Sequence, residues 1–330
     1  MTVKAVLLRG TGGVEVLHIG EHPDPVMKED ELLVRVRATA LNRADLLQRR
    51  GKHPPPKGVP NILGLEMAGE VASVGTACEG WAPGDRVCAL LPGCGYAEKV
   101  SIPAGLAMRI PGNLSFEQAA AIPEVFLTAY QNLFNVARLA AGQTVLIHAG
   151  ASGVGTAAIQ LVREAGGYSL VTAGSPEKIA RCIALGARAG WNYKDGPFAP
   201  WVAEQTGGRG VDIVLDFVGA PYFEQNLQTL AADGRMVVIG TMGGAEVGTF
   251  SLRTLMSKRL LIAGAGLRSM ETARKIALTR DFSEFALPRF ADGRLVPIVD
   301  TVFDWHEVGD AHLRMESNVN IGKIVLRVTG

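Results

Sequence analysis

The pattern of apolar and polar positions changes its period along the chain. The first third contains short apolar or alternating runs that end at Gly, Pro or acidic residues, which is typical of β-strands. These runs are KAVLLRG, ELLVRVRATAL and MAGEVASVG. From residue 115 the pattern becomes helical: Ser115 and Gln118 have the spacing of a capping box, and the apolar run behind them predicts a helix to Phe134. Beyond residue 143, strand and helix patterns alternate, which predicts a parallel, doubly wound sheet.

These periods predict an α/β protein with two domains, which the length of 330 residues also favours. We expect a β-rich domain over residues 1–120 and a parallel-sheet domain over residues 121–266. Residues 267–330 contain one helix and a closing strand, and we expect this segment to return to the first domain and complete it.

Composition narrows the classes of function. The formal net charge is +1, which argues against the basic surface that nucleic-acid binding requires. No apolar run reaches the roughly 18 residues of a membrane span, and the start MTVKAVLLRG is too short for a signal sequence, so we expect a cytoplasmic protein. Four cysteines without a C-x-x-C pair are expected to be free thiols.

The segment HAGASGVGTAAIQL, from His148 to Leu161, holds three glycines between an apolar strand and an amphipathic helix. We expect the strand to run from Thr144 to Ala149 and the helix to begin near Gly153. Free N–H groups and the helix dipole at such a turn favour a phosphate, and the missing side chains let a pyrophosphate approach. The spacing G-x-x-G-x-G departs from the usual dinucleotide fingerprint, so a tight turn without a ligand is the alternative.

The next strand ends in VTAGSPEK and bears on which cofactor would bind. Sites for NADH usually carry an acidic residue at this strand end, which binds the ribose 2′-hydroxyl. Here Gly174 and Ser175 stand at the strand end and Lys178 follows, which favours the 2′-phosphate of NADPH. The alternative is that Lys178 is an ordinary solvated helix residue.

Seven segments, in this order along the chain, resemble the zinc-free quinone oxidoreductase branch of the medium-chain dehydrogenase/reductase superfamily. They are NRADLLQRRG, ILGLEMAGEV, PGDRV, AAAIPEVFLTAY, HAGASGVGTAAIQL, VTAGSPEK and GKIVL. The resemblance covers nearly the whole chain and implies a Rossmann domain with a doubly wound parallel sheet, plus a β-rich GroES-like catalytic domain. Ser152 is shared with a subgroup that includes a tumour-suppressor-inducible NADPH quinone reductase and its bacterial relatives.

The resemblance also implies roles for individual residues. Three are expected at the catalytic cleft: Asn42 and Thr128 near the nicotinamide and substrate, and His53 where the family has a cleft tyrosine. An exposed loop histidine is the alternative for His53. The expected cofactor-binding residues are Ser152, Gly153 and Val154 at the phosphate turn, Gly174, Ser175, Lys178 and Tyr193 around the 2′-phosphate, Phe217, Val218 and Gly219 in the ribose-side loop, Ile239 and Gly240 after the next strand, and Leu267, Arg268 and Asn320 toward the nicotinamide.

A metal is not expected. Zinc-dependent members of the superfamily carry a cysteine near position 42 and a GHE element, but Leu65 stands where that histidine would be, and the four-cysteine structural lobe is absent. Without these ligands a zinc site cannot be closed. Glu66 remains, and we expect it to form a buried salt bridge with Arg43 or Arg49.

The function implied is zinc-independent transfer of hydride from NADPH to a quinone or similar electron-poor carbonyl. Two alternatives stay open: an NADPH-dependent reductase of the C=C bond of enones or 2-alkenals, and an NADPH-binding structural or RNA-binding relative with little turnover.

The apolar run SKRLLIAGAG, from Ser257 to Gly266, is expected to be an edge strand. Because such an edge is a liability unless paired, we expect a homodimer formed through it.

Overall fold

A computed structural model describes residues 2–329 and separates them into two units. The first unit contains the chain up to Leu127 and again from Arg268, and the second unit is Thr128–Leu267. The division falls within one helix, α3 (Pro123–Tyr130).

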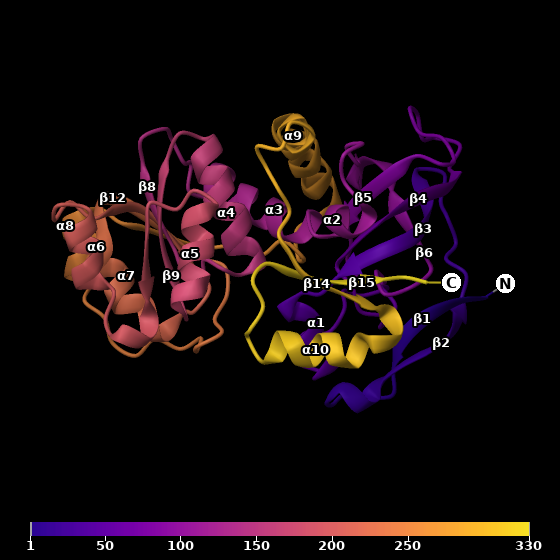
Figure 1. The fold of residues 1–330 in the computed structure, drawn as a ribbon, viewed down its shortest axis with the longest axis horizontal. Helices are drawn as coiled ribbons and strands as arrows, with labels where there is room; N and C mark the ends of the chain where they lie inside the picture. The colour runs from indigo at the N-terminus through magenta and orange to yellow at the C-terminus, as the bar shows by residue number, and fades with distance from the viewer. Residues whose placement is uncertain (1, 330) are drawn as a thin grey trace. The chain divides into compact units, whose positions relative to one another are not determined.

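The second unit is built on the parallel sheet that the alternating pattern predicts. Within Thr128–Leu267, six strands follow the order β10-β9-β8-β11-β12-β13, and all neighbours are parallel (Figure 1). This is the Rossmann order, which confirms the expected fold class, and it reverses between β8 and β11. The strands are β8 (Thr144–Ile147), β9 (Tyr168–Ala173), β10 (Ala189–Asn192), β11 (Val211–Asp216), β12 (Leu230–Val238) and β13 (Leu261–Gly264).

Helices cover both faces of this sheet. Figure 1 shows α4 and α5 on one side of it and α6, α7 and α8 on the other. All four residues of β8 are buried, because a central strand between two helical layers has no solvent face. The helices are α4 (Gly153–Glu164), α5 (Pro176–Ala184), α6 (Ala199–Gln205), α7 (Phe223–Thr229) and α8 (Leu252–Lys258).

The first unit is rich in antiparallel strands. Across residues 2–127 and 268–329, one sheet follows the order β14-β15-β3-β4-β5-β7 with β6 also paired to β3, and β1 and β2 form a separate hairpin. The closing strand β15 pairs with β3, and Leu326 lies opposite Thr39. The strands are β1 (Thr2–Leu8), β2 (Leu17–Pro23), β3 (Glu31–Ala40), β4 (Glu66–Val74), β5 (Arg86–Leu90), β6 (Lys99–Pro103), β7 (Ala107–Arg109), β14 (Val299–Asp304) and β15 (Lys323–Arg327).

The helix expected from Ser115 to Phe134 is not continuous. The capping box is confirmed, since Ser115 Oγ accepts from Gln118 N at 3.2 Å, but α2 (Phe116–Ala120) ends early. Pro123 explains the interruption: it lacks an N–H and disfavours a helical residue before it, so α3 begins there. From Gln131 to Val136 the chain continues as a π-helical segment. The other helices of this unit are α1 (Arg43–Arg49), α9 (Thr272–Ala291) and α10 (Val308–Glu316).

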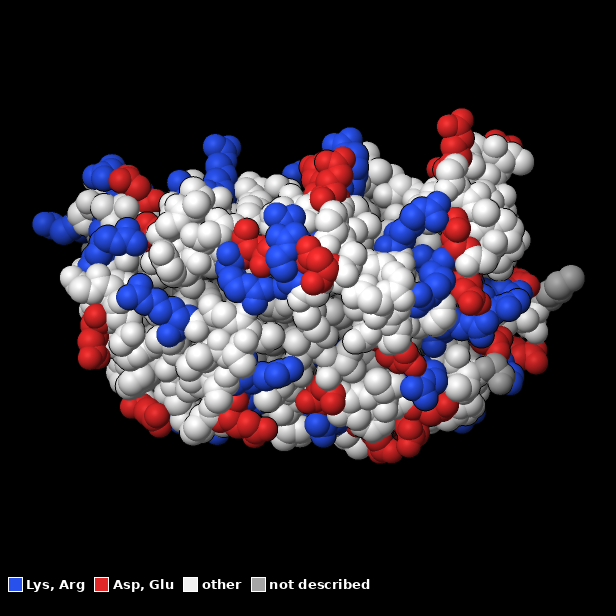
Figure 2. All heavy atoms as spheres, turned by 45° about the horizontal axis from the view of Figure 1, so that its top comes forward, with Lys and Arg blue, Asp and Glu red and all other residues white. Residues whose placement is uncertain are grey.

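The surface carries both signs of charge. On the face drawn in Figure 2, lysines and arginines alternate with aspartates and glutamates rather than forming a continuous basic area. None of the helices within residues 2–329 combines the length and the apolarity needed to cross a membrane.

Candidate functional site

The glycine-rich turn joins the end of β8 to the start of α4. Gly155 is required for packing, because a Cβ there would lie 2.4 Å from the carbonyl oxygen of Ala149. Ser152 caps α4: its hydroxyl accepts from Gly155 N at 3.1 Å, and its own N–H donates to Ala149 O at 2.9 Å. The side-chain oxygen and the backbone N–H of Ser152 therefore both form hydrogen bonds within the turn.

The start of α4 leaves donors for an anion. Within the described chain, no hydrogen bond is donated by the N–H groups of Gly153 and Val154, the first two residues of this 12-residue helix. The helix dipole adds partial positive charge at the same end. The turn follows β8 at the point where the strand order reverses, which is where open parallel sheets bind ligands. The geometry suits a pyrophosphate.

The tip of β9 brings four predicted residues together. Ser175 Oγ accepts from Lys178 N at 3.3 Å and caps α5, so Lys178 lies in the first turn of that helix. Tyr193 reaches over Gly174, since a Cβ on this glycine would lie 2.5 Å from the tyrosine hydroxyl. Tyr193 is 46% exposed, so it is not a core tyrosine.

Asp216 anchors the loop expected on the ribose side and the residues expected after the next strand. Its carboxylate accepts from the N–H groups of Val218 at 2.8 Å and Gly219 at 3.1 Å. Its backbone carbonyl accepts from Ile239 N at 2.8 Å and from Gly240 N at 3.3 Å. Sequence reasoning missed Asp216, although an aspartate at the end of an apolar strand was a usable signal.

The remaining residues expected on the second unit are buried. Phe217 is 8% exposed, Leu267 6% and Thr128 7%. The backbone carbonyl of Thr128 accepts from Asn132 Nδ2 at 2.7 Å.

In the first unit, Asn42 belongs to a buried ionic network. Its amide nitrogen donates to Glu66 Oε1 at 2.8 Å and its amide oxygen accepts from Lys323 Nζ at 2.7 Å. Lys323 Nζ also lies 2.8 Å from Glu66 Oε1. The side chain of Asn42 is thus engaged within the protein.

The expectation that Glu66 pairs with Arg43 or Arg49 is wrong. Glu66 pairs with Lys323, which β15 supplies from near the end of the chain. Arg49 instead forms a salt bridge with Glu316, and Arg43 donates to Asn318. Residues that pair across a sheet can lie far apart in sequence, so the presence of nearby arginines in the sequence did not identify the partner of Glu66.

A second buried acid adjoins this network. Asp45 accepts from Asn42 N at 2.8 Å and from Gly64 N at 2.9 Å. Burial nevertheless raises the pKa of Asp45 to about 6, with the Glu66 carboxylate adding to the rise. Perturbed carboxyl groups of this kind gather at functional sites, although structural ion networks also perturb them.

His53, Arg268 and Asn320 are all partly exposed. Burial and, secondarily, the charge of Arg268 lower the pKa of His53, so its imidazole is neutral near pH 7. Arg268 donates to Gln48 Oε1 at 2.7 Å and to Pro92 O at 3.0 Å. Asn320 Nδ2 donates to Gly322 O at 2.9 Å, within the turn before β15. The structure therefore brings His53 and Arg268 near each other, whereas Asn320 has its own local partner.

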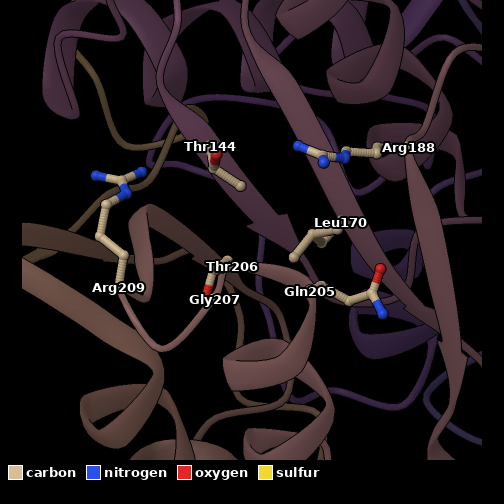
Figure 3. Close-up of a pocket in the computed structure, with 7 residues that line it drawn as sticks. All are labelled: Thr144, Leu170, Arg188, Gln205, Thr206, Gly207 and Arg209. Carbon is tan, nitrogen blue, oxygen red and sulfur yellow. The ribbon is translucent and has the colours of Figure 1, made fainter.

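Two further features bear on what this chain binds. Within residues 2–329, no group of three or more His, Cys, Asp and Glu side chains is placed to hold a metal ion. A pocket of about 300 Å³ is lined by Arg188, Arg209 and Thr144, among others (Figure 3). Thr144 begins β8, so this pocket adjoins the opposite end of the strand from the glycine-rich turn and is not the expected cofactor site.

Two family models match the chain. "Alcohol dehydrogenase GroES-like domain" matches residues 28–136 and "Zinc-binding dehydrogenase" matches residues 153–284. A quinone oxidoreductase from Lama guanicoe is 29% identical over 98% of this chain and 97% of its own length. The mouse synaptic vesicle membrane protein VAT-1 homolog-like is 30% identical over 99% of this chain and 81% of its own.

A polyketide synthase subunit of Mycobacterium tuberculosis, for phenolphthiocerol and phthiocerol, is 31% identical over 96% of this chain. The chain spans only 14% of that synthase. It is thus similar to one segment of a much longer protein, and the activity of the whole synthase is not carried over.

Solved structures match along the full length. A NAD-dependent alcohol dehydrogenase is 34% identical, with a TM-score of 0.87 over 99% of this chain and 100% of its own. The mycobacterial protein Rv1454c, complexed with NADPH, is 28% identical with a TM-score of 0.88 over the same shares. The CurK enoyl reductase is 28% identical with a TM-score of 0.87 over 99% of both chains.

Proposed function

Because this chain belongs to the medium-chain dehydrogenase/reductase superfamily, we propose that it is an NADPH-dependent quinone oxidoreductase that works without zinc. The superfamily makes it an oxidoreductase. The observation that carries the cofactor assignment is the tip of β9, where Gly174 and Ser175 follow the strand, Tyr193 reaches over Gly174, and Lys178 lies in the first turn of α5. The full-length similarity to the guanaco quinone oxidoreductase supports the acceptor.

The residues present fit a nicotinamide dinucleotide phosphate. The N–H groups of Gly153 and Val154 would hold the pyrophosphate, and Lys178 with Tyr193 would hold the 2′-phosphate. The loops fixed by Asp216 would support the ribose. When bound, this cofactor supplies a hydride, and the protein orients it and excludes competing reactions.

The acceptor must be electron-poor. Leu65 cannot bind a metal, so in our proposal no Lewis acid polarises the carbonyl oxygen of the acceptor. The acceptor must therefore be electrophilic by itself, and a quinone is electrophilic because its carbonyl groups are conjugated. The four cysteines, all in the described part of the chain, are free thiols, which fits a cytoplasmic location.

The test is the rate of NADPH oxidation by the purified chain with a panel of quinones, enones and 2-alkenals. We expect turnover with quinones at the highest kcat/KM. Turnover with enones alone would replace the quinone assignment by the alternative, reduction of a C=C bond, which the similarity to the CurK enoyl reductase favours.

A third outcome, NADPH binding without turnover on any acceptor, would favour a structural or RNA-binding relative. The interspersed charges of Figure 2 offer no support for RNA binding.

Activity should not depend on a metal. Treatment of the enzyme with a strong chelator should leave kcat unchanged, because Leu65 replaces a ligand that a zinc site of this superfamily needs. Loss of activity on chelation, with recovery on adding zinc, would show that the residue-based argument is mistaken.

The chain should form a homodimer through β13. Leu261 and Ile262 on this edge strand are 51% and 36% exposed, and within the described chain β13 pairs with β12 alone. Light scattering should report a dimer for the native chain and a monomer for Leu261→Lys, since a charge on the strand opposes pairing. Leu313→Lys, at a 47% exposed position on α10, is the matched control and should stay dimeric. A native monomer at micromolar concentration would refute the dimer.

A further inference from the structure

A row of buried polar side chains crosses the carboxyl ends of neighbouring strands in the second unit. His148, which directly follows β8, lies at its centre and is fully buried. Its Nδ1 lies 2.9 Å from the hydroxyl oxygen of Thr172 on β9, and its Nε2 lies 2.7 Å from Oδ1 of Asn226 on α7. Thr172 and Asn226 are fully buried as well. None of these three side chains is among the cofactor contacts proposed above.

Asp216, at the end of β11, extends this row. Its carboxylate accepts from the N–H groups of Val218 and Gly219, and the side chain of Asn226 faces it. Burial raises the pKa of Asp216, and the two backbone N–H groups and the Asn226 amide oppose that rise. Asn226 Nδ2 has no partner at hydrogen-bond distance among the described residues, so its contact with Asp216 is a long one. We call Thr172, His148, Asn226 and Asp216 the His148 network.

The partners in the His148 network fix which nitrogen of His148 carries the proton. An ionised carboxylate only accepts, so Asp216 faces the Nδ2 side of the Asn226 amide, and Oδ1 is left for His148. An amide oxygen also only accepts, so Nε2 of His148 donates to it, and Nδ1 accepts from the Thr172 hydroxyl. Every donor in the network therefore points toward Asp216.

Aromatic rings surround the imidazole and keep it neutral. The ring centroids of Phe198 and Tyr222 each lie 4.8 Å from that of His148. Burial lowers the pKa of His148 to about 4, and the hydrogen bond to Asn226 opposes this only in part. Near pH 7 the imidazole therefore keeps one donor and one acceptor, which is what its two partners require.

The strand ends that the His148 network joins carry the loops assigned to the cofactor in our proposal. The strands β9, β8 and β11 are adjacent, and the strand order reverses between β8 and β11, where parallel sheets bind ligands. The loop with Gly174 follows β9, the turn with Gly153 follows β8, and the loop with Val218 follows β11. His148 has no exposed surface, so a ligand cannot touch it. It can act on a cofactor only through the spacing of these loops.

We propose that His148 is a positioning residue that holds the loops after β8, β9 and β11 at the spacing at which they bind NADPH. This role rests on the proposed function. His148 does not touch the cofactor and takes no part in hydride transfer. A histidine that only fills the core would leave cofactor affinity unchanged when a ring of similar shape replaces it. The two roles therefore differ in what such a substitution does to binding.

The test compares His148→Phe with the native chain in calorimetric titrations with NADPH and with NADH, at a temperature where both proteins are folded. Phenylalanine keeps an aromatic ring at this position but removes both nitrogens, which breaks the His148 network in its middle. We expect Kd to rise about tenfold, on the scale of one hydrogen bond. Both cofactors should be weakened, because they share the pyrophosphate and ribose that these loops would bind.

His312→Phe is the matched control. His312 is also a fully buried histidine, on α10 in the first unit, and its Nδ1 lies 3.0 Å from Nη1 of Arg49. Loss of this contact should lower Tm but leave Kd for NADPH native, because His312 is not part of the parallel sheet.

His148→Gln should restore binding. The amide of glutamine offers one donor and one acceptor, as the neutral imidazole does. Kd for NADPH should return to within about threefold of the native value, since most of the lost hydrogen bonding is replaced. A Kd no better than that of His148→Phe would contradict the role of the two nitrogens.

A spectroscopic readout needs no cofactor. In 15N NMR spectra of histidine-labelled protein, His148 should give the signals of a neutral imidazole with its proton on Nε2, at about pH 6 and at about pH 8 alike. A proton on Nδ1 instead would mean that the Asn226 amide is reversed, with its oxygen toward Asp216, and would contradict the network.

Native Kd values for both cofactors in a folded His148→Phe protein would overturn the positioning role. If His148→Phe does not fold, Thr172→Val decides the question, because valine keeps the shape of the side chain and lacks only the hydroxyl. Its Kd for NADPH should rise about threefold, and a native Kd would overturn the proposal. A native chain that binds neither cofactor would instead overturn the proposed function, and the positioning role with it.

Discussion

Gly155→Val should yield little folded protein and no measurable binding of NADPH. A Cβ at this position would lie 2.4 Å from Ala149 O and 2.5 Å from Gly150 O, both of which are backbone atoms of the turn. Overpacking against side chains costs about 1–3 kcal/mol, and a backbone carbonyl yields less than a side chain, so the cost here should exceed that range. The measurement is Tm with and without NADPH.

Two variants bracket this result. Gly248→Val is the matched control, because a Cβ there meets nothing within 4 Å, and its Tm should be native. Gly153→Val should fold but lose the rise in Tm on adding NADPH, which corresponds to about 2.7 kcal/mol at a hundredfold excess over Kd. A Gly153→Val protein with the full NADPH-induced rise would contradict the phosphate-binding interpretation of the turn, and a folded Gly155→Val protein would contradict the packing role of Gly155.

Lys178→Ala should abolish most of the preference for NADPH over NADH. A hydrogen bond to a charged group contributes about 1.5–3 kcal/mol, which is roughly 10- to 150-fold in affinity. Affinity for NADH should be nearly unchanged, because that cofactor lacks the 2′-phosphate.

The control for this variant is Arg181→Ala, which removes a cation from the last turn of the same helix. It should keep the native ratio of NADPH to NADH affinity. If Lys178→Ala keeps that ratio as well, Lys178 is only a solvated helix residue.

The fold was predictable where the signal is local and periodic. Alternation of strand and helix patterns predicted the parallel sheet, and the apolar run around Leu261 predicted its edge strand β13. Pro123 shows the limit of prediction from such patterns, because the capping box at Ser115 and the apolar run that follows it predicted a single helix. The missing N–H of this single proline divides that run into α2 and α3.

The site was predictable to the same extent. The turn at Gly155 and the cap at Ser175 are formed by residues that are close in sequence, so the residue types alone indicate these local contacts. The pairing of Glu66 with Lys323 was not predictable, because it depends on the order of the strands in the sheet, where β4 and β15 lie on either side of β3. Asp216 was missed because its importance comes from two loops that meet only in the folded protein.

Isothermal titration calorimetry of the purified chain with NADPH and with NADH tests most directly whether the turn after β8 and the tip of β9 form an NADPH site. Our account predicts one NADPH bound per chain, with NADH at least about tenfold weaker, as the loss of a charge-assisted hydrogen bond requires. Equal affinities for the two cofactors, or no heat of binding with either, would contradict it.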